Sequence, residues 1–174
     1  MLFLVGQCGF DFLLLVDTSR SVALGHNQWL WVKLWMHTFL EQLNDRTEIG
    51  LYTRVAIFSF SNYTEVNARL TDNLDVYSLQ DIVANDYEGI TLQAEGKELA
   101  MALQEVRRHM VENTRYDESG QIKAGQTVVI FTEAKSCGHL SFCGLNSRRN
   151  ILSGLRSLMS KGISVYIVGK HNVP

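Results

Sequence analysis

The sequence predicts a single α/β domain, built on a doubly wound, mostly parallel sheet with helices on both of its faces. Short, almost continuously apolar runs alternate with longer amphipathic segments, which is typical of buried parallel strands joined by crossover helices. The chain has 174 residues, an ordinary length for one domain. Its composition, 46% hydrophobic and 20% charged, is that of a globular protein and excludes disorder.

Four apolar runs predict the buried strands of the sheet. They occupy residues 10–16, 55–60, 127–132 and 163–168. A fifth strand is expected at residues 63–70, directly after a tight turn at Ser61 and Asn62. This spacing predicts a hairpin, so the fifth strand should lie antiparallel at one edge of the sheet. The strand at residues 10–16 should be central.

Helical spacing of apolar residues predicts the helices between these strands. The expected helices are residues 27–44, a short helix capped by Ser78, a long helix over residues 99–110, and residues 147–160. In the first helix, the side expected to face the sheet consists of Leu30, Trp31, Leu34, Trp35, Phe39 and Leu43. In the last helix, the inward set consists of Ile151, Leu152, Leu155, Leu158 and Met159.

The charge balance excludes several classes of function. There are 16 Lys and Arg residues against 18 Asp and Glu residues, for a net charge of −2, so no basic surface for nucleic acid or an anionic membrane is expected. No apolar run approaches the ~18 residues of a membrane span. The sequence also has no glycine-rich nucleotide loop and no GxSxG nucleophile elbow.

Three cysteines and one sequon are the sequence features that distinguish a secreted protein from an intracellular one. Cys8, Cys137 and Cys143 are too few for a disulfide scaffold and contain no CxxC pair for zinc. A local Cys137–Cys143 disulfide would favour secretion, whereas three reduced thiols would favour an intracellular protein. Asn62-Tyr63-Thr64 is an N-glycosylation sequon, which has chemical meaning only in a secreted protein.

A run of polar residues directly follows the first strand. It reads Asp17-Thr18-Ser19-Arg20-Ser21, and its alternation aims one carboxylate and two hydroxyls the same way. Ligands of a doubly wound sheet bind beyond the carboxyl ends of its strands, which is where this run lies. Hard oxygen donors of this kind suit Mg²⁺. The alternative is that Asp17 and the serines only cap the following helix or satisfy a turn.

Two further segments extend this candidate site. Thr91 precedes the helix at residues 99–110 and offers a hydroxyl from a neighbouring loop. Glu133 ends the strand at residues 127–132, which should lie next to the first strand, and its carboxylate could hold a metal-bound water. The candidate metal-site residues for Mg²⁺ or Mn²⁺ are therefore Asp17, Ser19, Ser21, Thr91 and Glu133.

Five segments together resemble the von Willebrand factor A domain family over residues 10–169. They are FDFLLLVDTSRSV, VAIFSFS, GITLQAEGKELAMAL, TVVIFTE and KGISVYIVG. The resemblance implies a Rossmann-like fold with a metal-ion-dependent adhesion site, abbreviated MIDAS. It maps Asp17, Ser19, Ser21 and Thr91 onto metal ligands, and Glu133 onto an acidic residue that contacts a metal-bound water.

The same resemblance implies a non-enzymatic binding module rather than a catalyst. In this family the bound cation accepts an acidic side chain of a protein ligand as its next ligand. Collagen, other matrix proteins or cell-surface proteins are the partners that the extracellular relatives suggest. An extracellular or cell-surface location, as part of a larger protein, is the corresponding expectation.

The sequence departs from the family pattern in two places. The family usually ends the fourth strand with Asp-Gly, where this chain has Glu133-Ala134. The family also continues after the strand at residues 163–168 with a further strand and a long helix. The resemblance therefore implies a lead-in at residues 1–9 and a domain at residues 10–174 that lacks its last strand and helix. On that expectation, the strand at residues 163–168 is an exposed edge.

Two other functions are compatible with parts of the sequence. One is a Mg²⁺-dependent phosphohydrolase with Asp17 as nucleophile, but such enzymes carry a second aspartate two positions on, where this chain has Ser19. The other is an intracellular scaffold of the same fold that binds no metal, which the Glu133 substitution keeps open.

Overall fold

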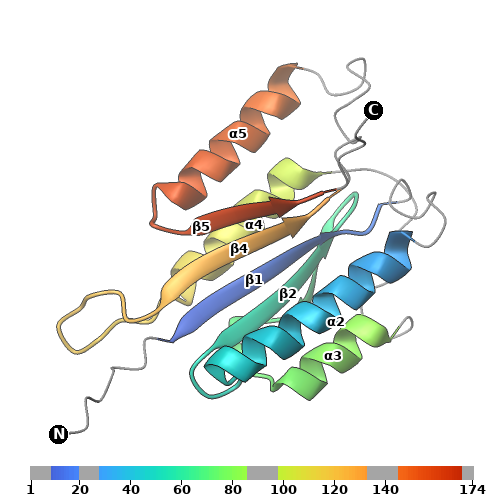
Figure 1. The fold of residues 1–174 in the computed structure, drawn as a ribbon. Helices are drawn as coiled ribbons and strands as arrows, with labels where there is room; N and C mark the ends of the chain where they lie inside the picture. Colours follow the sequence, from blue (N-terminus) through green and yellow to red (C-terminus); the bar gives the residue numbers. More distant parts are fainter. Residues whose placement is uncertain (1–8, 20–27, 86–97, 133–144, 170–174) are drawn as a thin grey trace, which may run out of the picture.

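A computed structural model describes residues 9–19, 28–85, 98–132 and 145–169. Within these residues the chain forms a five-stranded sheet in the order β3-β2-β1-β4-β5 (Figure 1). The strands are β1 Phe10–Asp17, β2 Arg54–Phe60, β3 Thr64–Ala68, β4 Gly125–Phe131 and β5 Ser164–Val168. Neighbouring strands run parallel except for β2 and β3, which are antiparallel. The mostly parallel sheet, its central first strand and its antiparallel edge are therefore confirmed.

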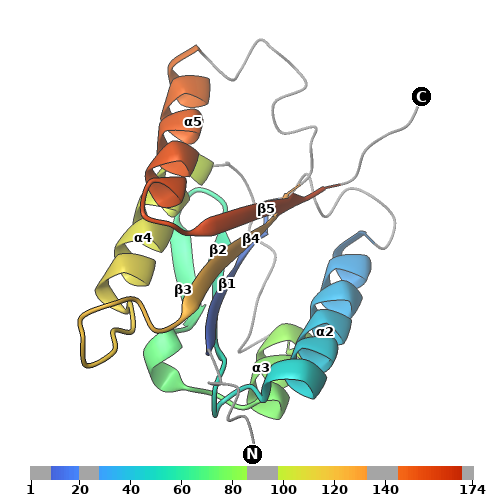
Figure 2. The same ribbon diagram turned by 60° about the vertical axis from the view of Figure 1, so that its left-hand side comes forward.

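Helices cover both faces of the sheet, as predicted. The helices are α2 Gln28–Thr47, α3 Val76–Ala84, α4 Leu99–Glu112 and α5 Leu145–Met159, and a short 3₁₀ helix, η1 Leu70–Asp72, follows β3. Figure 2 shows α2 and α3 on one side of the sheet and α4 and α5 on the other. None of the described helices is both long and apolar enough to cross a membrane.

The central strand is buried on both of its sides. Leu13 and Leu15 belong to the core between the sheet and α4, whereas Leu14 and Val16 belong to the core on the α2 and α3 side. All four side chains are fully buried. This burial on both faces explains why β1 is a continuous apolar run rather than an alternating one.

The predicted sheet-facing side of α2 is wrong in part. Trp31 is 66% exposed, and Leu30 and Leu34 are also more than half exposed, whereas Met36 and Leu40 are fully buried. Apolar residues occupy nearly every position between Trp29 and Met36, so the periodicity does not single out one face. The position of the helix over the sheet decides the buried face instead.

Two smaller predictions about the helices are also corrected. In α5, Leu158 is buried as expected, but Leu152 and Met159 are more than half exposed. In α3, the N-cap is Asp75 rather than Ser78: the Asp75 Oδ1 accepts a hydrogen bond from the Ser78 backbone N–H at 2.8 Å. This hydrogen bond holds the pKa of the Asp75 carboxyl below its usual value.

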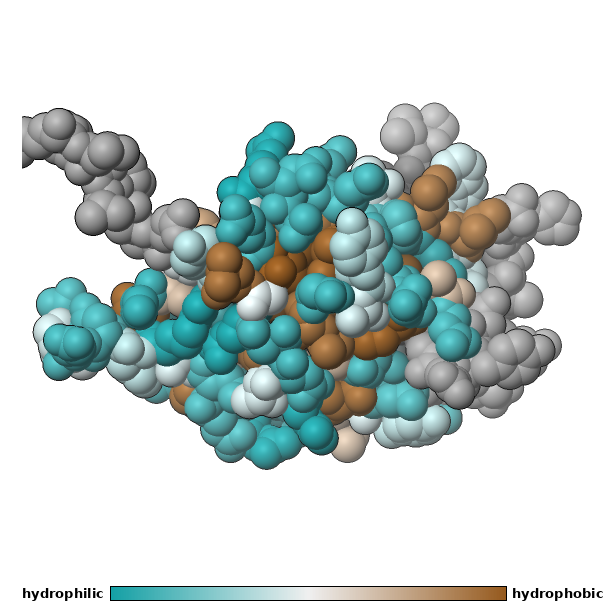
Figure 3. Space-filling view, turned by 90° about the horizontal axis from the view of Figure 1, so that it is seen from below, coloured by the Kyte–Doolittle hydropathy of each residue, from teal (hydrophilic) through white to brown (hydrophobic). Residues whose placement is uncertain are grey.

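Apolar side chains also reach the surface. Figure 3 shows a band of hydrophobic residues between hydrophilic ones on the face seen from below. On the described surface as a whole, the large apolar residues that are more than half exposed include Trp31 and Leu34 of α2 and Tyr166 and Ile167 of β5.

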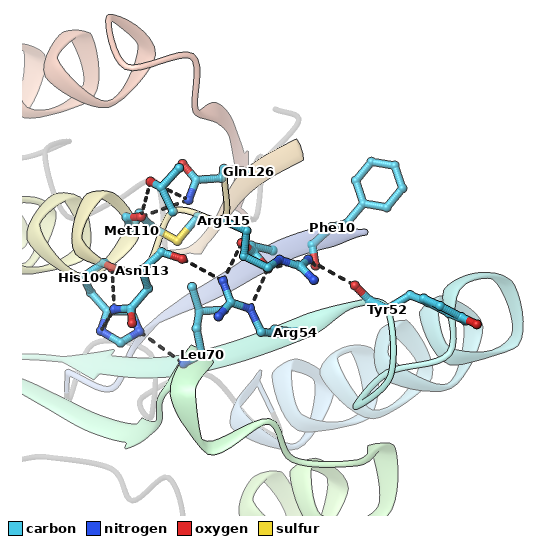
Figure 4. A network of polar contacts seen from close by, with 11 residues as sticks. Phe10, Tyr52, Arg54, Leu70, His109, Met110, Asn113, Arg115 and Gln126 are labelled. Carbon is cyan, nitrogen blue, oxygen red and sulfur yellow. Dashed lines mark hydrogen bonds and ion pairs between the residues drawn. The ribbon is translucent and has the colours of Figure 1, made fainter. Parts of the chain in front are cut away.

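A buried charge network joins the amino ends of β1 and β2 (Figure 4). The Asp11 carboxylate is fully buried and accepts two hydrogen bonds from Arg54, Nε to Oδ1 at 2.9 Å and Nη2 to Oδ2 at 2.8 Å. Arg115 forms a second ion pair with Asp11 at 2.8 Å. Arg54 Nη2 also donates to the Asn113 carbonyl at 2.7 Å, so the network ties the segment after α4 to the sheet.

Candidate metal centre

Asp17 is the last residue of β1 and lies at the carboxyl edge of the sheet. It stands opposite Phe60, the last residue of β2, and the neighbouring β4 ends at Phe131. Figure 1 shows these three strands ending at the same end of the molecule. Only 1% of the Asp17 surface is exposed, so its carboxylate is held inside the protein rather than in water.

Two different segments hold the two oxygens of the Asp17 carboxylate. Oδ1 accepts hydrogen bonds from the Ser19 backbone N–H at 3.0 Å and from the Ser19 hydroxyl at 2.5 Å. Oδ2 accepts a hydrogen bond from the Thr132 hydroxyl at 2.8 Å. The Ser19 bonds arise locally, because an aspartate readily hydrogen-bonds the backbone two residues on. Together the hydrogen bonds from Ser19 and Thr132 fix the orientation of the buried Asp17 carboxylate.

Backbone hydrogen bonds gather the neighbouring segments around this carboxylate. The Thr18 N–H donates to the Phe60 carbonyl at 2.9 Å, which joins the start of the DxSxS run to the end of β2. The Glu98 N–H, just before α4, donates to the Ser61 carbonyl at 2.7 Å. The segments that follow β1 and β2 and the segment that precedes α4 therefore meet at one edge.

The structure brings together two of the five predicted site residues. Asp17 and Ser19 are hydrogen-bonded to each other. Ser21, Thr91 and Glu133 lie outside the described residues. Thr132 is not among the predicted site residues, although its hydroxyl at the end of a strand predicted to flank β1 was the signal that could have indicated it.

The sequence is similar to a known family of domains over nearly its whole length. The model of the von Willebrand factor type A domain matches residues 11–173. The chain belongs to this family. The match confirms the resemblance that the DxSxS run and the strand segments predict.

Solved structures of von Willebrand factor A folds resemble this domain. The manganese-loaded TRAP protein of Plasmodium vivax has a TM-score of 0.66 and 22% identity, covering 95% of this chain and 59% of that one. The conserved hypothetical protein BatB from Bacteroides thetaiotaomicron has a TM-score of 0.63 and 15% identity, covering 92% of this chain and 66% of that one. Proximal thread matrix protein 1 from the mussel byssus, with a zinc-occupied MIDAS motif, has a TM-score of 0.64 and 18% identity, covering 95% of this chain and 37% of that one.

These likenesses establish the fold of the domain. The chain spans between 37% and 66% of the length of these three structures. No curated protein matches the sequence. Two of the similar structures are described with a metal, manganese in one and zinc in a MIDAS motif in the other.

The described donors of this von Willebrand factor A domain fit a hard divalent cation. In the part of the chain that the structure covers, no group of three or more His, Cys, Asp or Glu residues could hold a metal. Asp17 and the Ser19 hydroxyl instead offer one negative charge and neutral oxygens, which suits Mg²⁺ or Mn²⁺ completed by water. A cation bound with so little protein charge stays electron-poor and retains affinity for a further carboxylate.

Proposed function

We propose that this von Willebrand factor A domain is a divalent-cation-dependent module that binds a protein partner. The observation that supports it is the Asp17 carboxylate, which is buried at the carboxyl edge of the sheet with both oxygens held in place. Burying a charge is costly unless it is compensated, and a bound cation compensates a carboxylate directly. The family match over residues 11–173 supports the same reading.

In this proposal Asp17, Ser19, Ser21 and Thr91 hold the cation, and Glu133 holds a metal-bound water. A bound Mg²⁺ or Mn²⁺ would supply an open coordination position for an acidic group of the partner. Ser19 and Thr132 keep the Asp17 oxygens in one orientation, so the carboxylate needs little reorganisation when the cation arrives. We assign no catalytic residue, because Ser19 occupies the position where a phosphohydrolase needs an acid.

The proposed partner is an extracellular matrix or cell-surface protein, with collagen as one candidate. The proposed location is correspondingly outside the cell or at its surface, as part of a larger protein. The family resemblance supports both proposals, and one of the similar structures is itself a thread matrix protein.

Calorimetric titration of Mg²⁺ and Mn²⁺ tests the proposed site. We expect saturable binding to the wild type and none to Asp17→Ala. Asp117→Ala is the matched control, because Asp117 Oδ1 accepts the same two bonds from Ser119, at 2.8 and 2.6 Å, but in an exposed loop. No binding to folded wild-type protein would contradict the proposal and favour the metal-independent scaffold.

A second variant defines the role of Glu133. Glu133→Asp shortens the acid to the length usual in the family. Tighter Mn²⁺ binding would show that Glu133 crowds the cation, and weaker binding would show that the longer acid helps to hold it, through a metal-bound water or as a direct ligand.

A further inference from the structure

We propose that Asn62 is an N-glycosylation site whose glycan stands beside the candidate metal centre. Asn62-Tyr63-Thr64 is the only Asn-x-Ser/Thr sequence in the chain. It occupies the turn between β2 and β3, at the end of the sheet where β1 also ends (Figure 1). The proposal therefore includes passage of the chain through the secretory pathway, where the sugar is attached.

The turn presents the asparagine to solvent. The Ser61 N–H donates to the Tyr63 carbonyl at 3.0 Å, which closes a tight turn with Asn62 at its tip. Asn62 is exposed and Tyr63 is 58% exposed, whereas the flanking Ser61 is 1% exposed. The turn thus exposes Asn62 next to the buried Ser61, and a surface modification site requires such an exposed asparagine.

The position of the turn relative to Asp17 follows from the strand register. Asp17 lies opposite Phe60, and Asn62 is two residues beyond Phe60. Neighbouring strands are separated by about 4.8 Å and rise about 3.3 Å per residue, so Asn62 lies on the order of 10 Å from Asp17. A partner that approaches the carboxyl edge from the β2 side would meet sugar before protein; this consequence rests on the proposed function.

The attachment reaction needs one co-reactant, a lipid-pyrophosphate-linked oligosaccharide. The Asn62 Nδ2 forms a bond to the anomeric carbon of the first sugar, and the bond from that carbon to the pyrophosphate oxygen breaks. The amide nitrogen loses one proton, and the lipid pyrophosphate leaves with the bonding electron pair. No oxidation or reduction takes place.

Expression of the whole chain behind a cleavable secretion signal in human cells tests the modification. We expect peptide-N-glycosidase to convert the modified Asn62 to aspartate, detected by peptide mass spectrometry of both secreted and cell-retained protein. Asn62→Gln and Thr64→Val should abolish the modification. Thr64→Ser should retain it, because this variant keeps the hydroxyl of the sequon.

The same protein, expressed in human cells, is used to test the position of the glycan relative to Asp17. Mn²⁺ bound at Asp17 should broaden the nuclear magnetic resonance signals of an isotope-labelled sugar on Asn62. The control is a second sequon on an Asn62→Gln background, made by Gln121→Asn with Lys123→Thr, both at exposed sites before β4. The attachment site of its sugar lies about 25 Å from Asp17 along β1, against about 10 Å for Asn62, so the sixth-power distance dependence makes the broadening there roughly two hundredfold weaker.

Each outcome decides one part of the proposal. Unmodified Asn62 in folded wild-type protein would overturn the glycosylation site, whether or not Mn²⁺ binds. Equal broadening of the two sugars, in protein that binds Mn²⁺ by calorimetry, would overturn its placement. If calorimetry finds no Mn²⁺ binding, the proposed metal function fails, and mass spectrometry still decides the modification.

Discussion

At the scale of single residues, Thr132 is the contact that ties the candidate metal centre to the neighbouring strand. Its hydroxyl holds Asp17 Oδ2, the oxygen that Ser19 does not hold. We expect Thr132→Val to weaken Mn²⁺ binding about threefold to tenfold, because an intramolecular hydrogen bond contributes about 1 kcal/mol. Thr132→Ser keeps the hydroxyl and should bind like the wild type. Equal affinities of the valine variant and the wild type in calorimetric titration would remove Thr132 from the site.

His109 makes the stability of the domain depend on pH. Its Nε2 accepts a hydrogen bond from the Leu70 N–H at 3.2 Å (Figure 4), and burial, with the nearby Arg69 and Arg108, lowers its pKa below 6.5; Glu105 and Glu112 act against this. The unfolded chain therefore binds this proton at a higher pH than the folded one, and stability falls as the pH drops below 6.5.

We expect the wild type to lose up to about 1.4 kcal/mol of unfolding free energy at pH 5.5 through this residue, measured by urea denaturation. His109→Gln offers an acceptor that does not titrate, and its loss between pH 7.5 and 5.5 should be smaller. Parallel pH dependences of the two proteins would show that His109 does not carry the effect.

The sequence predicts contacts at this scale only where the partners are close along the chain. Asp17 and Ser19 are two residues apart, and their motif indicates the pair directly. Thr132 is 115 residues from Asp17, and Arg54 is 43 residues from Asp11. Those contacts depend on how the strands are aligned, which hydrophobic patterning of a single strand does not specify.

At the scale of elements, the Asp11 network fastens β1 to β2 and to the segment after α4. Removing the carboxylate leaves two guanidinium groups, Arg54 and Arg115, without the fully buried partner that they share; their own side chains are 17% and 25% exposed. We expect Asp11→Asn to lower the unfolding free energy by about 3–5 kcal/mol, because it breaks a buried ion pair from one side. Urea denaturation measures this loss.

The matched control is Glu105→Gln, which removes an exposed ion pair with Arg108 on α4. Solvent-exposed pairs contribute little, so this variant should unfold almost like the wild type. Similar losses in both variants would show that burial does not set the strength of the Asp11 network.

The sequence predicts the positions of helices and strands better than it predicts which face of a helix is buried. The strands were predictable because residues that are buried on both sides are continuously apolar. The buried face of α2 was not, because the first half of this helix is apolar almost all round. In such a helix the exposed tryptophan Trp31 and the buried Met36 look alike in the sequence.

At the scale of the whole molecule, β5 is one of the two edge strands of the sheet that the described residues form. In the described part of the chain it pairs only with β4, and Ile167 on it is 61% exposed. An apolar edge strand with free backbone groups is a template for pairing with a second chain. We expect the average mass in light scattering to rise with protein concentration.

Ile167→Lys should suppress this association by placing a charge on the edge. Leu51→Lys is the control, since Leu51 is similarly exposed but lies between α2 and β2, away from β5. A wild type that stays monomeric at high concentration would contradict the prediction.

Metal binding at one edge should also stabilise the whole domain, because the DxSxS run and the segments around it come together only in the folded chain. Mg²⁺ or Mn²⁺ at a hundred times its dissociation constant should add about 2.7 kcal/mol to the unfolding free energy. For a chain of this size, that raises the melting temperature by roughly 5–10 °C. EDTA should reverse the shift, Asp17→Ala should show none, and Asp117→Ala should show the wild-type shift. A cation-dependent rise that survives Asp17→Ala would place the ion elsewhere on the molecule.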